Sequence, residues 1–119
     1  MLGSKKGVEA LASLSGHGYK YRVQNYTSSL SQLTFEARGD SCRYSITFQT
    51  TYYVQTTIWW DQGDFALATT DKFEELAEAL GLDAPQRERL LLFVAAPPNR
   101  PEVLVLCNRV FVSQEIPLP

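Results

Sequence analysis

An alternation of apolar and polar residues runs from Arg43 to Trp60 and is the longest regular pattern in the chain. Even-numbered positions carry mainly Tyr, Ile, Phe, Val and Trp, whereas odd-numbered positions carry mainly Ser, Thr and Gln. A period of two residues is typical of a β-strand with one buried face. Because no Gly, Pro, Asn or Asp interrupts it, we predict one long strand that bends between Gln49 and Tyr53. Its first half is expected to pair with earlier strands and its second half with later ones.

Shorter strand patterns surround this segment. Residues 19–24 and 32–38 alternate in the same way. The sequence GDS at 39–41, between the second of these segments and Arg43, indicates a turn. The sequence DQGD at 61–64 predicts a hairpin loop, after which Phe65 and Leu67 open a further strand. Residues 103–112 are rich in branched apolar side chains, which favours a central strand covered on both faces.

Helical spacing of apolar residues appears in two segments. Residues 5–15 are predicted to form a short amphipathic helix, which Gly7 weakens. Residues 71–80 form the clearest helical pattern, and Asp71 with Glu74 has the spacing of a capping box. These two segments are the helices expected to cover the sheet.

The region after the second helix is less regular. Pro85 suits the first turn of a further short helix, with Asp83 or Ala84 as its cap. Residues 90–96 are an apolar run too short for its period to distinguish a helix from a strand, so both assignments stay open.

Together these patterns predict an α+β fold, with a curved, mostly antiparallel sheet of about five or six strands and two or three helices packed on one face. The chain has 119 residues, of which 45% are hydrophobic and 20% charged, and these values fit a single domain over residues 1–119. The predicted core consists of Leu11, Leu14, Tyr21, Val23, Leu33, Phe35, Ile46, Phe48, Val54, Ile58, Phe65, Leu67, Phe73, Leu76, Leu80, Leu104 and Leu106.

Composition and charge narrow the classes of function. No apolar run approaches the roughly 20 residues that span a bilayer, and the N-terminus lacks the apolar stretch of a secretory signal. We therefore expect a cytoplasmic protein with no membrane partner. Residues 1–60 hold six basic and three acidic residues, and residues 61–119 hold five basic and ten acidic residues. This bipolar distribution favours contacts between copies of the chain or an anionic partner at the basic end.

Signatures of catalysis and metal binding are missing from the sequence. His17 lies alone between two glycines, and neither a nucleophile motif nor a phosphate-binding glycine loop occurs. Cys42 and Cys107 lack metal-ligand spacing and are predicted to be reduced structural thiols, with a single disulfide left open. The acidic residues of 61–64 and 74–78 are interpreted as a turn and a solvated helix face. We therefore expect no cofactor and no metal, and we favour a non-catalytic protein over an enzyme.

The odd-numbered face of the long strand supplies the leading functional hypothesis. Exposed strands usually carry Lys and Glu, yet this face has no charge from Ser45 to Trp59. A neutral exposed face, or a face covered by the chain's own helices, is the simpler explanation, and an interface is the functional one. As an interface, the face predicts a protein-binding or assembly module that contacts another protein or a second copy as a homodimer. The candidate contact residues are Gln49, Thr51, Tyr53, Gln55, Thr57 and Trp59.

Two alternatives stay open. A curved sheet with helices on its concave side can enclose a cavity for a small ligand or a substrate. Alternation also places four basic residues on one polar side of the sheet, where they can bind an anion or single-stranded nucleic acid. These residues are Lys20, Arg22, Arg38 and Arg43. The acidic isoelectric point near 5.3 and the lack of an RNA-recognition signature rank nucleic acid lowest among the hypotheses.

Overall fold

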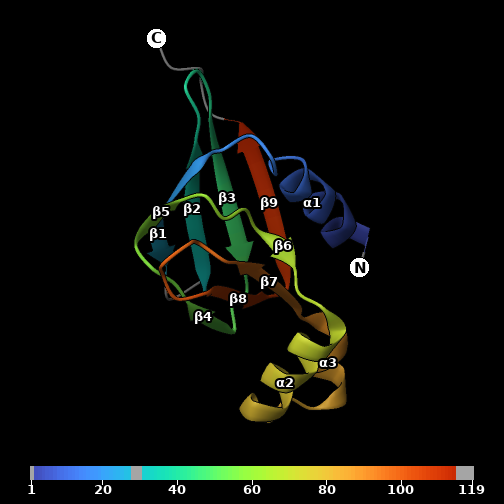
Figure 1. The fold of residues 1–119 in the computed structure, drawn as a ribbon. Helices are drawn as coiled ribbons and strands as arrows, with labels where there is room; N and C mark the ends of the chain where they lie inside the picture. Colours follow the sequence, from blue (N-terminus) through green and yellow to red (C-terminus); the bar gives the residue numbers. More distant parts are fainter. Residues whose placement is uncertain (1, 28–30, 115–119) are drawn as a thin grey trace.

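A computed structural model describes residues 2–27 and 31–114, which form two antiparallel sheets and three helices (Figure 1). Sheet A has the spatial order β5-β1-β2-β3-β9, with β1 (Lys20–Thr27), β2 (Gln32–Arg38), β3 (Arg43–Gln49), β5 (Trp59–Asp61) and β9 (Arg109–Gln114). Sheet B has the order β4-β8-β7-β6, with β4 (Tyr53–Gln55), β6 (Ala66–Leu67), β7 (Leu91–Ala95) and β8 (Val103–Cys107). The helices are α1 (Leu2–Ala12), α2 (Thr70–Leu80) and α3 (Ala84–Arg89).

The α+β class predicted from the sequence is confirmed, whereas the single sheet is wrong because the strands divide into two. The apolar run at 90–96, left open between helix and strand, forms β7. The predicted strand at 103–112 is two strands, because the chain passes from β8 of sheet B to β9 of sheet A at Asn108.

Sheet B is the middle layer of the molecule. Its Phe93 and Val105 belong to a core shared with sheet A, whereas the adjacent Leu92 and Leu106 belong to a second core shared with α2. Alternate residues of a strand point to opposite faces, so both faces of sheet B are buried. The core between the sheets contains a cluster of six aromatic rings, those of Tyr21, Phe35, Phe48, Trp60, Phe65 and Phe93.

The predicted long strand from 43 to 60 is wrong, because the chain divides there into β3, β4 and β5. The division begins at Thr50, whose φ of 52° lies in the left-handed region that a β-branched residue rarely adopts. After this residue the chain leaves sheet A, and β4 pairs with β8 of sheet B. It then returns to sheet A, where β5 pairs with β1. The break therefore needs no turn residue, because β3 before it is paired within sheet A and β4 after it is paired with β8 of sheet B.

The division changes which side chains are buried. Val54 and Ile58, both predicted in the core, are 38% and 75% exposed. Leu67, also predicted in the core, lies on the edge strand β6 and is 49% exposed. Trp60, which the core prediction omitted, is fully buried. Tyr53 was predicted on the polar face but packs against the second core.

Helix α1 lies beside β9 and β6 at one edge of the molecule (Figure 1). It covers residues 2–12 rather than the predicted 5–15. A Cβ atom at Gly7 would stand 1.9 Å from the carbonyl oxygen of Val110 in β9, so only glycine allows this close approach. The residue that weakens the helical pattern in the sequence is thus the residue that lets the helix pack.

The caps of α2 and α3 follow different rules. The N-cap of α2 is Thr69, whose hydroxyl accepts a hydrogen bond from Lys72 N at 3.2 Å. The capping box predicted at Asp71 and Glu74 is therefore wrong. In α3 the predicted cap Asp83 is confirmed. It forms a capping box with Gln86, in which the side chain of each residue accepts a hydrogen bond from the backbone N–H of the other.

Candidate functional site

One face of sheet A carries no helix or strand over it in the part of the chain that the structure describes, because α1 and sheet B pack on the inner face and α2 packs on sheet B. Alternate residues of the five strands point outward on this surface, which we call the open face. Its residues are Lys20, Arg22, Asn25, Thr27, Gln32, Thr34, Glu36, Arg38, Arg43, Ser45, Thr47, Gln49, Trp59, Asp61, Arg109, Phe111 and Ser113.

The strand register gathers basic side chains at one end of the open face. Lys20 pairs with Arg38, and Arg38 pairs with Arg43, so three cations stand in a row on adjacent strands. Strands lie about 4.8 Å apart, and like charges directly opposite each other repel. Arg22 follows Lys20 by two residues on the same strand face. The four basic residues that alternation grouped on one polar side therefore do lie together, while their role in binding stays a prediction.

Glu36 lies at the centre of this charged end. It is 2% exposed although it points to the open face, and Arg22 and Arg43 flank it. The Arg22 Nε donates to Glu36 Oε1 at 2.9 Å, and the Arg43 Nη1 lies 3.5 Å from Glu36 Oε2. Within the described part of the chain, neither Glu36 Oε2 nor Arg43 Nε has a hydrogen-bond partner. The buried carboxylate thus holds two arginines in place without using all of their donors.

Two exposed aromatic residues stand at the edge strands of the open face. Trp59 in β5 pairs with Arg22 and is 54% exposed. The guanidinium carbon of Arg100 lies 4.5 Å from the centre of the Trp59 ring, a cation–π contact, and Arg100 Nη1 donates to the Thr57 hydroxyl at 3.4 Å. Phe111 in β9, at the opposite edge, is 45% exposed.

The six residues predicted as one uncharged contact surface do not share a face. Gln49 and Trp59 lie on the open face of sheet A, Thr51 and Thr57 lie in the connections between strands, and Tyr53 and Gln55 lie in β4 of sheet B. The prediction of a single face fails because the chain changes sheets after Thr50, which breaks the alternation on which that face depends. Whether the individual residues contact a partner stays a prediction.

Sequence reasoning missed Glu36 and Phe111 as members of the site. Glu36 reads as a solvated strand residue, since its burial depends on arginines from two neighbouring strands. Phe111 was assigned to a strand covered on both faces. In the sequence, the polar residues Arg109 and Ser113 share a strand face with Phe111, and they were the available signal that one face of this segment is open.

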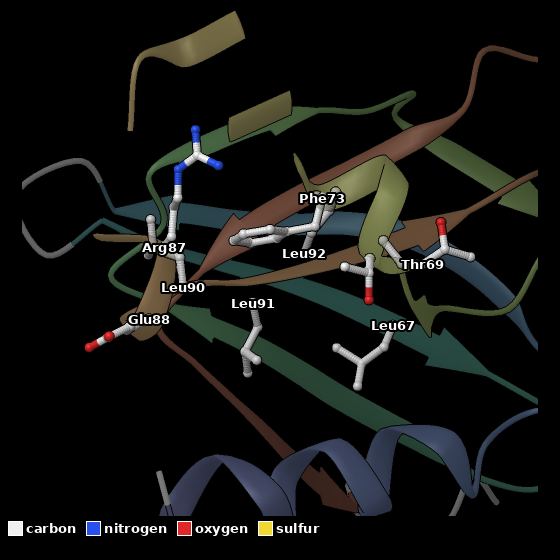
Figure 2. Close-up of a pocket in the computed structure, with 10 residues that line it drawn as sticks. Leu67, Thr69, Phe73, Arg87, Glu88, Leu90, Leu91 and Leu92 are labelled. Atoms are coloured by element: carbon white, nitrogen blue, oxygen red, sulfur yellow. The ribbon is translucent and has the colours of Figure 1, made fainter. Parts of the chain in front are cut away.

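A second candidate is a hollow of about 340 Å³ between sheet B and the helices α2 and α3 (Figure 2). In Figure 2, the side chains of Leu67 and Leu91 project toward the same side of the sheet, away from the ring of Phe73. Arg87 lies at its margin and is engaged by the carboxylate of Glu74. The buried side-chain atoms that lack partners among the described residues belong to the open face instead. The hollow therefore lacks the converging unpaired polar groups that orient a small ligand.

The two cysteines and the histidine lie outside both candidate sites. Cys42 and Cys107 are free thiols, as predicted, and burial raises the pKa of Cys107 to about 12. His17 is exposed and stacks on Tyr19 with ring centres 5.4 Å apart. Within residues 2–27 and 31–114, no three His, Cys, Asp or Glu side chains are grouped so as to hold a metal. None of the helices described is long and apolar enough to cross a bilayer.

The fold and the site define a two-sheet α+β protein in which one sheet face is open and carries a fixed charge cluster between exposed aromatic residues. Comparisons of the chain with protein-family models, with curated proteins and with solved structures find no match. The geometry of the open face is the strongest basis for a function.

Proposed function

We propose that the protein is a non-catalytic binding module that docks another protein through the open face of sheet A. The observation that carries this proposal is the uncovered sheet face, which has Trp59 and Phe111 exposed at its two edges and a fixed arginine cluster between them. Trp and Arg are enriched among the residues that dominate the energy of protein interfaces. Arginines already held by a carboxylate lose less side-chain entropy on binding than free ones.

The size of the open face fits this role. Its five strands, from β5 across to β9, have 3, 8, 7, 7 and 6 residues. With about 4.8 Å between strands and about 3.3 Å per residue, the five strands give roughly 490 Å² of projected area. A standard protein interface buries about 800 Å² on each partner. The open face with its rim therefore supports a small, reversible interface rather than an obligate one.

The two alternative functions have weaker support. A small-ligand site would be the hollow of Figure 2, which is mostly apolar and has no unpaired buried polar group among the described residues. Single-stranded nucleic acid would use the basic row, but one side of the Trp59 ring is occupied by Arg100, and Phe111 pairs with Thr47, four residues along β3 from Arg43. Base stacking needs free ring faces close to the cations.

Site-specific photo-crosslinking in cells of the natural source tests the proposal. A photoreactive amino acid is placed at Thr47, in the middle of the open face, and in a matched variant at Glu78, on the exposed surface of α2. We expect a protein adduct of defined mass from position 47 and none from position 78. An adduct of twice the mass of the chain would identify the partner as a second copy. No adduct from position 47, or the same adducts from both positions, would exclude docking through this face.

A further inference from the structure

The basic row is costly for the protein on its own. Lys20, Arg38 and Arg43 face one another across directly paired strand positions, an arrangement that destabilises a sheet. Among the residues that the structure describes, neither Lys20 nor Arg38 forms an ion pair. Asp61 stands opposite Lys20 in the register without an ion pair to it. An anionic group that binds this row would remove the repulsion.

Glu36 fixes how the neighbouring arginines present their donors. A guanidinium group has five N–H donors in a rigid plane and can bind one carboxylate through Nε and a second through its terminal nitrogens. Arg22 uses Nε for Glu36, and its side chain is still 56% exposed. Arg43 is 33% exposed and leaves Nε unpaired. The cluster of one carboxylate and two guanidinium groups keeps a net positive charge. Because the Arg43 Nε is buried, only the terminal nitrogens of the two partly exposed guanidinium groups can donate to a ligand at the surface.

A polar hollow of about 330 Å³ continues the basic row beyond the end of the sheet. It is lined by His17, Gly18, Lys20, Arg38, Gly39 and Asp40. Because Lys20 and Arg38 belong both to this hollow and to the basic row, the two form one continuous cationic strip across the ends of β1, β2 and β3. A strip of this length matches an extended segment with several charges better than a single small ion.

We infer that the partner binds this strip with an acidic peptide segment, whose side-chain carboxylates contact Lys20, Arg38 and the unused donors of Arg22 and Arg43. Glu36 acts as a positioning residue that holds the two arginines. This inference rests on the proposed function and adds the chemistry of the partner. Carboxylates on a short segment fit better than a nucleic acid, because the chain carries a net charge of −2 and its second half is acidic. A long polyanion is repelled by that field, whereas a local segment is not.

The first test compares defined probes. A fluorescent peptide with four Asp or Glu residues in a neutral background is titrated with the protein, beside a single-stranded oligonucleotide of the same charge. We expect the peptide to bind more tightly than the oligonucleotide and to bind about tenfold more weakly to Lys20→Glu and Arg38→Glu. The control Arg89→Glu makes the same charge change on α3 and should leave peptide binding within about twofold. Tighter binding of the oligonucleotide, no peptide binding, or an equal loss in the control would overturn the inference.

The second test isolates Glu36, because simple electrostatics and positioning predict opposite results. Removal of a negative charge from a surface that binds anions should strengthen binding, and Asp61→Asn on the same face should do so slightly. Glu36→Gln should instead weaken peptide binding by about three- to tenfold, because Arg22 and Arg43 lose the charge that holds them. Circular dichroism confirms that both variants are folded. Stronger binding by Glu36→Gln would overturn the positioning role.

The failure of this inference is distinguishable from the failure of the proposed function. If the crosslinked adduct at Thr47 forms and is unchanged by Lys20→Glu and Arg38→Glu, the open face docks a protein whose recognition does not use the basic strip. If no adduct forms at Thr47, docking through the open face is wrong, whatever the peptide does.

Discussion

The outer faces of the two sheets are both built from alternating strands, yet one is covered and the other is open. The outer face of sheet B carries Leu92, Leu104 and Leu106 and lies under α2. The corresponding face of sheet A carries charged and hydroxyl residues and has no helix over it among the described elements. A strand with apolar residues on both faces must lie in the middle of a layered fold, whereas a strand with one polar face lies outside. The apolar residues on the outer face of sheet B, which sheet A lacks, therefore place sheet B in the middle layer.

The largest effect that separates the two faces is expected from Leu106→Ala. Leu106 is 1% exposed in the core under α2, so its truncation should lower the free energy of unfolding by about 2–5 kcal/mol. The matched variant Thr47→Ala on the open face removes the hydroxyl contact with Thr34 at 3.2 Å and should lower it by no more than about 1 kcal/mol. Urea denaturation of both variants measures the difference. Equal losses would mean that the open face is packed as tightly as the covered one.

The next largest loss of stability is expected on the inner face of sheet A, which packs against the core between the two sheets. Tyr21 Oη donates to Asp64 Oδ1 at 2.5 Å, and burial together with this hydrogen bond raises the pKa of Tyr21 above its ordinary value. Tyr21→Phe removes a bond to a charged group and should lower stability by about 2 kcal/mol near pH 7.

The pH dependence of Tyr21 follows from the direction of its pKa shift. A raised pKa in the folded state means that this stabilisation is complete below the pKa of the unfolded chain, about 10, and is lost as pH rises above it. Stability of the wild type and of Tyr21→Phe should therefore converge at alkaline pH. A difference that stays constant from pH 7 to pH 11 would contradict the assignment.

On the open face itself, the stability effect of Glu36→Gln should be smaller, about 1 kcal/mol of destabilisation. Loss of one partner from a fully buried ion pair costs about 3–5 kcal/mol, because a charge is left without solvent. Here the arginine partners are 56% and 33% exposed, so water replaces most of the lost interaction. Thermal and urea unfolding measure the change. A gain in stability would mean that burial of the carboxylate costs more than the two arginines return.

The fold was predictable from the sequence where neighbouring strands are also neighbours in the chain. The inner and outer faces of β2, of β3 and of β1 as far as Val23 follow from alternation, and β2 and β3 are joined by a short turn. The register of β1 shifts between Val23 and Asn25, which alternation does not predict. The prediction fails at Thr50, because the next residues pair with β8, some fifty positions later in the chain. Tyr52 N donates to Leu106 O at 2.7 Å, a contact that local patterns do not contain. Such long-range pairing overrides the local preference for a continuous strand.

The same distinction applies to the candidate site. Alternation was enough to group Lys20, Arg22, Arg38 and Arg43 on one side, because Lys20 and Arg22 precede the register shift in β1 and the pairing of β2 with β3 is regular. The burial of Glu36 was not predictable, since it depends on the registers of β1 and β3 on both sides of β2. A one-residue shift in either register would place Glu36 beside different residues. Sequence patterns therefore assign faces, and register creates the site.

The smallest expected effect concerns Arg100 and the edge of the open face. An exposed cation–π contact contributes about 0.5–1 kcal/mol, so Arg100→Ala should change stability little. Its effect on Trp59 is more informative, since the guanidinium group shields one side of the ring. Trp60, the other tryptophan, is fully buried, so quenching of fluorescence by acrylamide reports almost entirely on Trp59. We expect stronger quenching for Arg100→Ala than for the wild type.

The control for this measurement is Arg109→Ala, which removes an exposed arginine from β9 at the far edge of the same face. Quenching in this variant should equal that of the wild type, because β9 and β5 are separated by three strands. If the acidic peptide protects Trp59 from acrylamide in the wild type, the edge of the open face lies within the footprint of the bound segment. If the peptide binds without protecting Trp59, the contact is confined to the basic strip, and the aromatic edge is left for a different part of the partner.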